Sequence, residues 1–221
     1  MRQCGAIACL LGMAVALAGC IVGPPRPRGA AHSEVPASAL ADFNRGAARM
    51  EQYRYSEAAT AFEKVLRAAP GWNAARFNLG LAYLNMQGQR GAQASLQAAR
   101  EALEAACAAE PKHLHARFCL GLYHQHLGEN EQALACFQAV RESDRHDPHV
   151  AYKCAETLIA LGRNEEGVKL LEEVVAADPG FISAVYRLAL QYQRGGKTGQ
   201  AAGLFERFKT LSAVELAGGS F

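Results

Sequence analysis

The chain has 221 residues, and half of them are apolar, which is enough to bury a substantial core. The formal net charge is only +2, with basic and acidic residues interspersed, and this balance argues against the strongly basic surface that nucleic-acid binding requires. The same high apolar content and low net charge argue against disorder over the whole length.

Residues 1–19 have the features of a cleaved signal peptide. Arg2 supplies a short positive start, and residues 6–18 are almost wholly apolar but too few to span a membrane as a mature helix. This stretch ends in Leu17 to Cys20 (LAGC), which resembles the lipobox of bacterial lipoproteins. The resemblance implies that the Cys20 thiol carries a diacylglycerol and that acyl chains anchor the chain in a membrane. An ordinary secretory signal with a nearby cysteine is the alternative.

The segment that follows predicts a tether. By resemblance to the sorting pattern of lipoproteins, Ile21 indicates the periplasmic side of the outer membrane, with the inner membrane and the cell surface as alternatives. Residues 20–38 are expected to form a lipid-anchored, disordered linker, because a proline-rich segment favours extended backbone and cannot build a core. Its prolines are Pro24, Pro25, Pro27 and Pro36.

The rest of the chain repeats a helical pattern. A proline inside a helix costs about 3 kcal/mol, so the four further prolines must lie between helices; they are Pro70, Pro111, Pro148 and Pro179. An aromatic residue recurs at intervals of 34, 41, 34 and 34 residues, at Phe43, Phe77, Phe118, Tyr152 and Tyr186. Farther along each unit, a small residue recurs four positions before a large apolar one, as in Ala58 and Phe62. This spacing predicts pairs of closely packed helices.

The segments Phe77 to Tyr83 (FNLGLAY) and Ala133 to Phe137 (ALACF) resemble the tetratricopeptide repeat. The resemblance implies an all-α fold, an α-solenoid of five tetratricopeptide helix-turn-helix repeats preceded by the disordered linker. The expected units are residues 39–72, 73–113, 114–147, 148–181 and 182–213, with a short tail at 214–221. Seven extra residues around 86–93 lengthen the second unit. Asn130 and Asn164 are expected to act as N-caps of second helices.

The resemblance also implies a concave groove, lined by the first helix of each pair, in which family members hold peptides or partner subunits. The aromatic row and its polar neighbours would line it, although the row also fits simple packing between helices. The expected groove residues are Phe43, Asn44, Phe77, Asn78, Phe118, Tyr152, Lys153, Tyr186 and Arg187. The two asparagines resemble part of a clamp for a terminal carboxylate, but the accompanying lysine is missing, so such a ligand is not expected.

Other sites receive little support from the sequence. Six of the seven histidines lie between His113 and His149, but the close pairs among them point about 200° apart on a helix, so no metal site is expected. Four further cysteines could form disulfides: Cys107, Cys119, Cys136 and Cys154. A bond between Cys107 and Cys119 is geometrically the easiest, because they flank the turn at Pro111. The alternative is that these cysteines pack as small apolar side chains. The chain contains no phosphate loop, GxSxG or HExxH, so neither catalysis nor a cofactor is expected.

The last expected helix, at about residues 198–213, keeps an apolar face that residues 214–221 are too few to cover. Partner binding, self-association through this helix or a further domain would cover it. We therefore expect a membrane-anchored scaffold that binds a peptide or partner subunit, in outer-membrane, pilus or secretion assembly. Two alternatives stay open: the binding arm of a larger secreted protein that continues into a β-propeller-type domain, and an accessory factor for metal or haem proteins.

Overall fold

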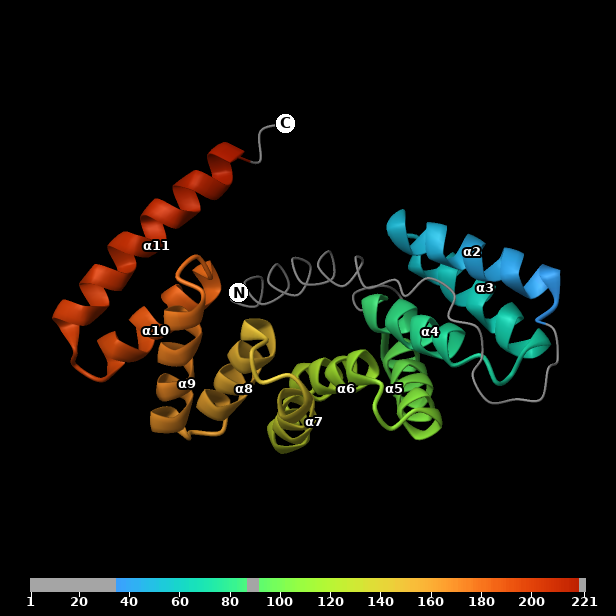
Figure 1. The fold of residues 1–221 in the computed structure, drawn as a ribbon, viewed down its shortest axis with the longest axis horizontal. Coiled ribbons are helices and arrows are strands. Elements are labelled where there is room, and N and C mark those ends of the chain that lie inside the picture. The colour runs from blue at the N-terminus through green and yellow to red at the C-terminus, as the bar shows by residue number, and fades with distance from the viewer. Residues whose placement is uncertain (1–34, 87–91, 219–221) are drawn as a thin grey trace. The chain divides into compact units, whose positions relative to one another are not determined.

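The computed structural model describes residues 35–86 and 92–218 (Figure 1). These residues form ten α-helices and no strand, which confirms the all-α prediction. The expected signal peptide, Cys20 and most of the linker lie outside the described residues. Within the described part of the chain, no helix is both long enough and apolar enough to cross a membrane.

The helices follow one another in pairs. The first helices of the five pairs are α2 (Ala37–Glu51), α4 (Asn73–Asn85), α6 (Leu114–His126), α8 (Pro148–Ala160) and α10 (Ile182–Arg194). The second helices are α3 (Tyr55–Ala68), α5 (Ala92–Ala109), α7 (Asn130–Ser143), α9 (Asn164–Ala177) and α11 (Thr198–Gly218). Each first helix begins within two residues of the start of an expected unit. The helix α11 runs on to Gly218, past the end expected at residue 213, so part of the expected tail is helical.

The chain divides into two compact units, residues 1–123 and 124–221. The first contains α2 to α5 and most of α6, and the second contains the end of α6 and α7 to α11. Within each unit, helices that are consecutive in the sequence lie side by side: α2 packs on α3, α3 on α4 and α4 on α5, and the same order continues from α7 to α11 (Figure 1). Each of these helices therefore packs against the helices that adjoin it in the sequence of its own unit.

Close contacts between a glycine and a large side chain hold the helices of a pair together. A Cβ atom at Gly46 would lie 2.7 Å from the ring of Phe62, and one at Gly80 would lie 2.7 Å from Cγ of Leu103. Phe62 and Leu103 are fully buried. The first helix thus approaches the second to a distance that only glycine permits.

The recurring aromatic residues join one pair to the next. In three repeats, the ring of the first helix packs on a ring that immediately precedes the next first helix. These contacts, with their centroid distances, are Phe43 with Trp72 (4.7 Å), Phe77 with His113 (4.9 Å) and Tyr152 with Phe181 (5.1 Å). Aromatic contacts of this kind add to the apolar area that they bury. The row therefore stacks the repeats.

The turn inside four of the pairs uses one backbone geometry. Gly128, Gly162 and Gly196 have φ angles of 75° to 78°, which suit glycine at a helix C-terminus. In the first pair the same position holds Tyr53, with a φ of 57°. A side chain in this left-handed region costs roughly 1–2 kcal/mol. The first repeat thus makes the shared turn with a residue that is strained there.

The expected N-caps at Asn130 and Asn164 are wrong. These residues are the first of α7 and α9, the cap positions are Glu129 and Arg163, and neither cap makes a side-chain hydrogen bond. The reason is the short turn, because one residue separates the left-handed glycine from the helix. Side-chain caps occur on two first helices instead: Asp147 accepts from the backbone N–H groups of His149 and Val150, and Nδ1 of His113 accepts from Ala116 N–H.

We expect Gly80→Ala to lower the free energy of unfolding by about 1 kcal/mol. The new methyl group would overpack Leu103 at a cost of roughly 1–3 kcal/mol, which exceeds the gain of about 1 kcal/mol in helix propensity. Gly203→Ala is the matched control, because a Cβ atom there meets nothing within 4 Å, and it should raise the stability by about 1 kcal/mol. Urea denaturation, monitored by circular dichroism, gives the free energy of unfolding of both variants. Equal changes in the two variants would contradict the close contact at Gly80.

Candidate functional site

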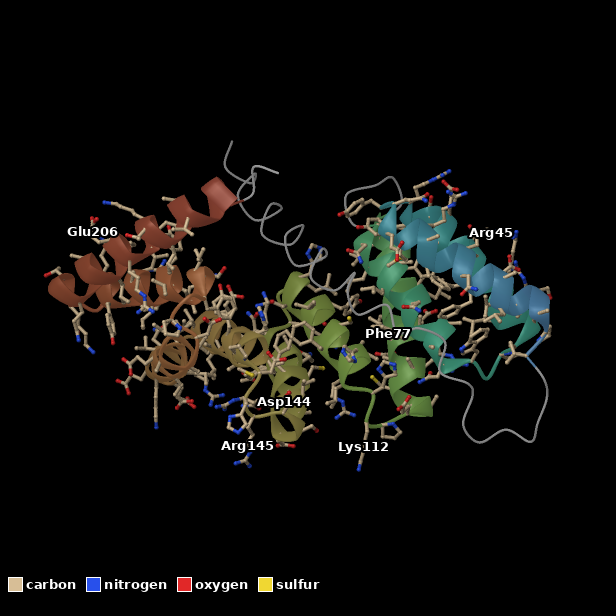
Figure 2. All side chains as sticks on the ribbon, turned by 45° about the horizontal axis from the view of Figure 1, so that its top comes forward. Arg45, Phe77, Lys112, Asp144, Arg145 and Glu206 are labelled. Carbon is tan, nitrogen blue, oxygen red and sulfur yellow. The ribbon has the colours of Figure 1, made fainter. Side chains whose placement is uncertain are left out.

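The aromatic residues expected to line a groove are mostly enclosed. The exposed fractions are 1% for Phe43, 0% for Phe77 and 6% for Tyr152, and Figure 2 shows Phe77 within the first unit. A ligand cannot reach side chains buried to this extent. The expectation that these three residues line an open groove is therefore wrong, and packing between helices explains them. Phe118 is half-buried, and Tyr186 is 42% exposed.

The two asparagines of the expected groove have different environments. Asn44 is exposed on α2. Asn78, at the equivalent position of α4, is only 1% exposed, and its amide nitrogen and oxygen have no hydrogen-bond partner among the described residues. A buried amide without partners costs roughly 1–3 kcal/mol. The two asparagines therefore do not form a pair of accessible donors.

A carboxylate that the sequence analysis missed organises the polar residues of α8 and α10. Lys153 Nζ donates to Glu156 at 2.8 Å, and the Tyr152 hydroxyl donates to it at 3.0 Å. The guanidinium of Arg187, on α10, donates to the same carboxylate. The side chain of Glu156 is 11% exposed. The structure thus brings together three of the expected groove residues, Tyr152, Lys153 and Arg187, around Glu156.

The charges in this cluster keep Glu156 ionised. Burial raises the pKa of the Glu156 carboxyl, but Lys153, Arg187 and Tyr152 together lower this pKa to below its ordinary value. Burial lowers the pKa of Arg187, but the adjacent Glu156 outweighs it, so the guanidinium stays charged. Two cations therefore surround one carboxylate, and the cluster has a net positive charge.

Arg187 connects this buried cluster to the surface. Its side chain is 40% exposed, whereas that of Lys153 is buried. A guanidinium has five donors, so Arg187 can bind Glu156 and still donate outward to a carboxylate of another molecule. The neighbouring Tyr186 lies against Phe208 and Phe205 of α11, with ring centroids 4.8 and 6.1 Å apart, and exposes the rest of its ring. Tyr186 and Arg187 are thus two adjacent residues of the expected groove whose side chains are both partly exposed.

The sequence contained a signal for this cluster. Arg187 follows Lys153 by 34 residues, so both occupy the same position of consecutive repeats, and Glu156 lies one helical turn after Lys153. The pairing of Glu156 with Arg187 could have been found by placing the repeats side by side as stacked helices. Glu156 itself does not belong to the recurring pattern, and its pairing with Arg187 depends on which helices lie side by side.

The histidines and cysteines have structural environments. Within residues 35–86 and 92–218, no group of three or more His, Cys, Asp or Glu side chains could hold a metal ion. The ring of His113 packs against Phe77, its Nδ1 caps the N-terminus of α6, and burial lowers its pKa.

The expected disulfide between Cys107 and Cys119 is not formed in the structure, because Cys107 carries a free thiol. Cys119 is fully buried in its unit.

Consecutive helix pairs, joined by close glycine contacts and stacked rings, define a helical-repeat protein. The family models agree with this class. One tetratricopeptide repeat model matches residues 29–71, 43–94 and 89–148, a second matches residues 126–192, and a third matches residues 183–211. The chain belongs to the tetratricopeptide repeat family, whose repeats are protein-interaction modules. This confirms the family predicted from the sequence.

Known relatives share the fold over most of the chain. The structure is similar to that of the MamA RS-1 ArsTM double mutant, with a TM-score of 0.73, 18% identity and coverage of 82% of this chain and 98% of that chain. It is similar to MamA 41-end from Desulfovibrio magneticus RS-1, with a TM-score of 0.73, 18% identity and coverage of 81% and 98%. At these identities the likeness concerns the fold alone.

A short region also resembles the TPR repeat-containing protein YpiA of Bacillus subtilis (strain 168). The two are 35% identical over 51 residues, which are 23% of this chain and 12% of YpiA. The match thus spans only about an eighth of that relative, and the likeness concerns the repeats alone.

We expect Glu156→Gln to lower the free energy of unfolding by roughly 2 kcal/mol at pH 7, because it leaves the buried Lys153 without its counter-charge. The folded pKa of Glu156 lies below its ordinary value of 4.5, so its stabilising effect is present above pH 4.5 and is lost as the pH falls below it. The difference between variant and wild type should therefore shrink on acidification, as measured by denaturation at several pH values. Glu206→Gln, in the exposed pair with Lys209, is the control and should change stability by less than about 0.5 kcal/mol.

Proposed function

We propose that this chain is a lipid-anchored scaffold that binds a partner protein through Tyr186 and Arg187 on α10. The observation that carries the proposal is the half-exposed Arg187, which Glu156 holds in place from the buried side. Because the guanidinium is already fixed, a partner loses little side-chain entropy when it binds there. The side chain of Arg187 is still 40% exposed, which leaves part of it accessible to a partner.

The site suits a segment that carries an acidic residue beside an apolar one. The carboxylate would pair with Arg187, for which a planar guanidinium is well suited, and the apolar side chain would cover the exposed part of Tyr186. A short extended segment or one face of a helix can present both groups. The net positive charge of the Glu156 cluster favours the acidic residue.

The proposed location is the periplasmic side of the outer membrane, with Cys20 as the lipid anchor. The LAGC sequence supports the anchor, and the proline-rich segment between Cys20 and α2 supports a spacer. An extended linker of this length, at roughly 3.1 Å per residue, would let the repeats reach up to about 50 Å from the membrane. A scaffold held at that distance suits the assembly of an outer-membrane, pilus or secretion complex.

We expect Arg187→Ala to reduce the capture of cross-linked membrane partners by about tenfold, because a charge-assisted hydrogen bond to the partner is lost. Arg145→Ala is the control: Arg145 is an exposed arginine in the turn before α8, and its loss should leave capture unchanged (Figure 2). Circular dichroism verifies that both variants are folded, and Arg187→Lys should recover part of the capture. An unchanged set of partners for Arg187→Ala would contradict the role of this site.

Substitution of Cys20 tests the anchor separately. We expect the wild type, expressed in a Gram-negative host, to incorporate labelled palmitate and to sediment with membranes. Cys20→Ala should lose the label, because lipid transfer requires the thiol. Label on Cys20→Ala, or none on the wild type, would disprove lipidation without affecting the proposal for Arg187.

A further inference from the structure

The first unit has a shallow cavity of about 210 Å³ between α2 and α3. Basic side chains from both helices line it, and Figure 2 shows Arg45 at its position on α2. The lining residues are Arg45, Arg49, Glu57, Thr60, Ala61 and Lys64. The proposed partner site at Tyr186 and Arg187 lies in the other unit, so the two sites share no residue.

The cations of the cavity are only partly neutralised. Its one carboxylate, Glu57, is shared, because it accepts from Arg54 at 2.6 Å and lies 3.4 Å from Arg49. Arg45 pairs with Asp42 outside the cavity, at 2.7 Å. Lys64 is exposed, and its ammonium forms no hydrogen bond or ion pair with a described residue. The cavity therefore has uncommitted positive charge.

The polar groups of the cavity are mainly donors. Each arginine has five N–H groups and uses only some of them in the contacts described, and the Lys64 ammonium has three. The Thr60 hydroxyl donates to the carbonyl oxygen of Ser56, so its proton is already engaged. Donors that come from two helices suit an oxyanion with several terminal oxygens, such as phosphate, and the three cations of the cavity outnumber its one carboxylate, Glu57.

We propose that this cavity binds a phosphate group, with Arg45, Arg49 and Lys64 as its donors. The source of the phosphate is the headgroup of an anionic phospholipid. This source rests on the proposed anchoring through Cys20, since α2 is the first described helix after the linker and is the repeat segment nearest to the anchor in the sequence. Binding of a phosphate by the cavity does not depend on the anchor.

Titrations of the full chain in a maltoside detergent test the proposal. The probes are inorganic phosphate, glycerol phosphate and short-chain phosphatidylglycerol, and the readout is the dissociation constant from backbone amide shifts. The test variant is Lys64→Gln combined with Arg45→Gln. The control variant is Arg145→Gln combined with Lys169→Gln, which removes the same charge from exposed sites in the second unit.

We expect saturable binding of all three probes, with shifts in α2 and α3. The test variant should bind about tenfold more weakly, since each basic residue near an anionic headgroup contributes several-fold, and the control should change by less than about twofold. Tighter binding of phosphatidylglycerol than of inorganic phosphate supports the headgroup, whereas equal binding assigns the cavity to free phosphate. Absence of saturation, or equal weakening in test and control variants, would overturn the proposal. If the wild type from a Gram-negative host binds phosphate but carries no palmitate, the proposed anchor is wrong and the phosphate site stands.

Discussion

The first unit depends on the close approach of the two helices in each of its pairs, α2 with α3 and α4 with α5. Where Gly46 faces Phe62 and Gly80 faces Leu103, even one methyl group would collide with the large side chain opposite. This contact sets the spacing of the pair, and the spacing decides which side chains reach the next repeat. The rings of Phe43, Phe77 and Tyr152 can then pack against the ring that precedes the following helix. A single repeat cannot bury a core of its own, so the stability of each unit depends on these contacts between repeats.

The packing role of the aromatic row decides where function can lie. A ring that joins two repeats is enclosed and unavailable to a ligand, and the proposed recognition therefore uses neighbouring polar positions. In the second unit, these positions hold Lys153 and Arg187. Both donate to Glu156, which offsets the repulsion between the two cations and leaves the group with a net positive charge. Burial alone would raise the pKa of Glu156, and its cationic partners reverse that effect. The same side chains thus connect α8 to α10 and hold Arg187 at the site proposed for partner binding.

The two units present different chemistry within one repeated fold. The first unit carries a donor-rich cavity between α2 and α3, whereas the second exposes a tyrosine and an arginine on α10. A repeat fold permits this division, because the packing positions are shared while the surface positions vary freely. The left-handed Tyr53, at a position where other pairs have glycine, shows that the first repeat also departs from the shared pattern in its backbone.

The sequence by itself determined the all-α class, the family and the succession of helix pairs, because prolines, small residues and large apolar residues recur with a helical period. It also showed which side chains share a position, such as Lys153 and Arg187. It did not determine which of those positions are enclosed: Phe77 and Tyr186 look equivalent along the chain, but one is buried and the other is exposed. Burial depends on the neighbour that covers each helix. Only the tertiary structure could therefore assign the rings to packing, place Glu156 between two cations and reject the N-caps at Asn130 and Asn164.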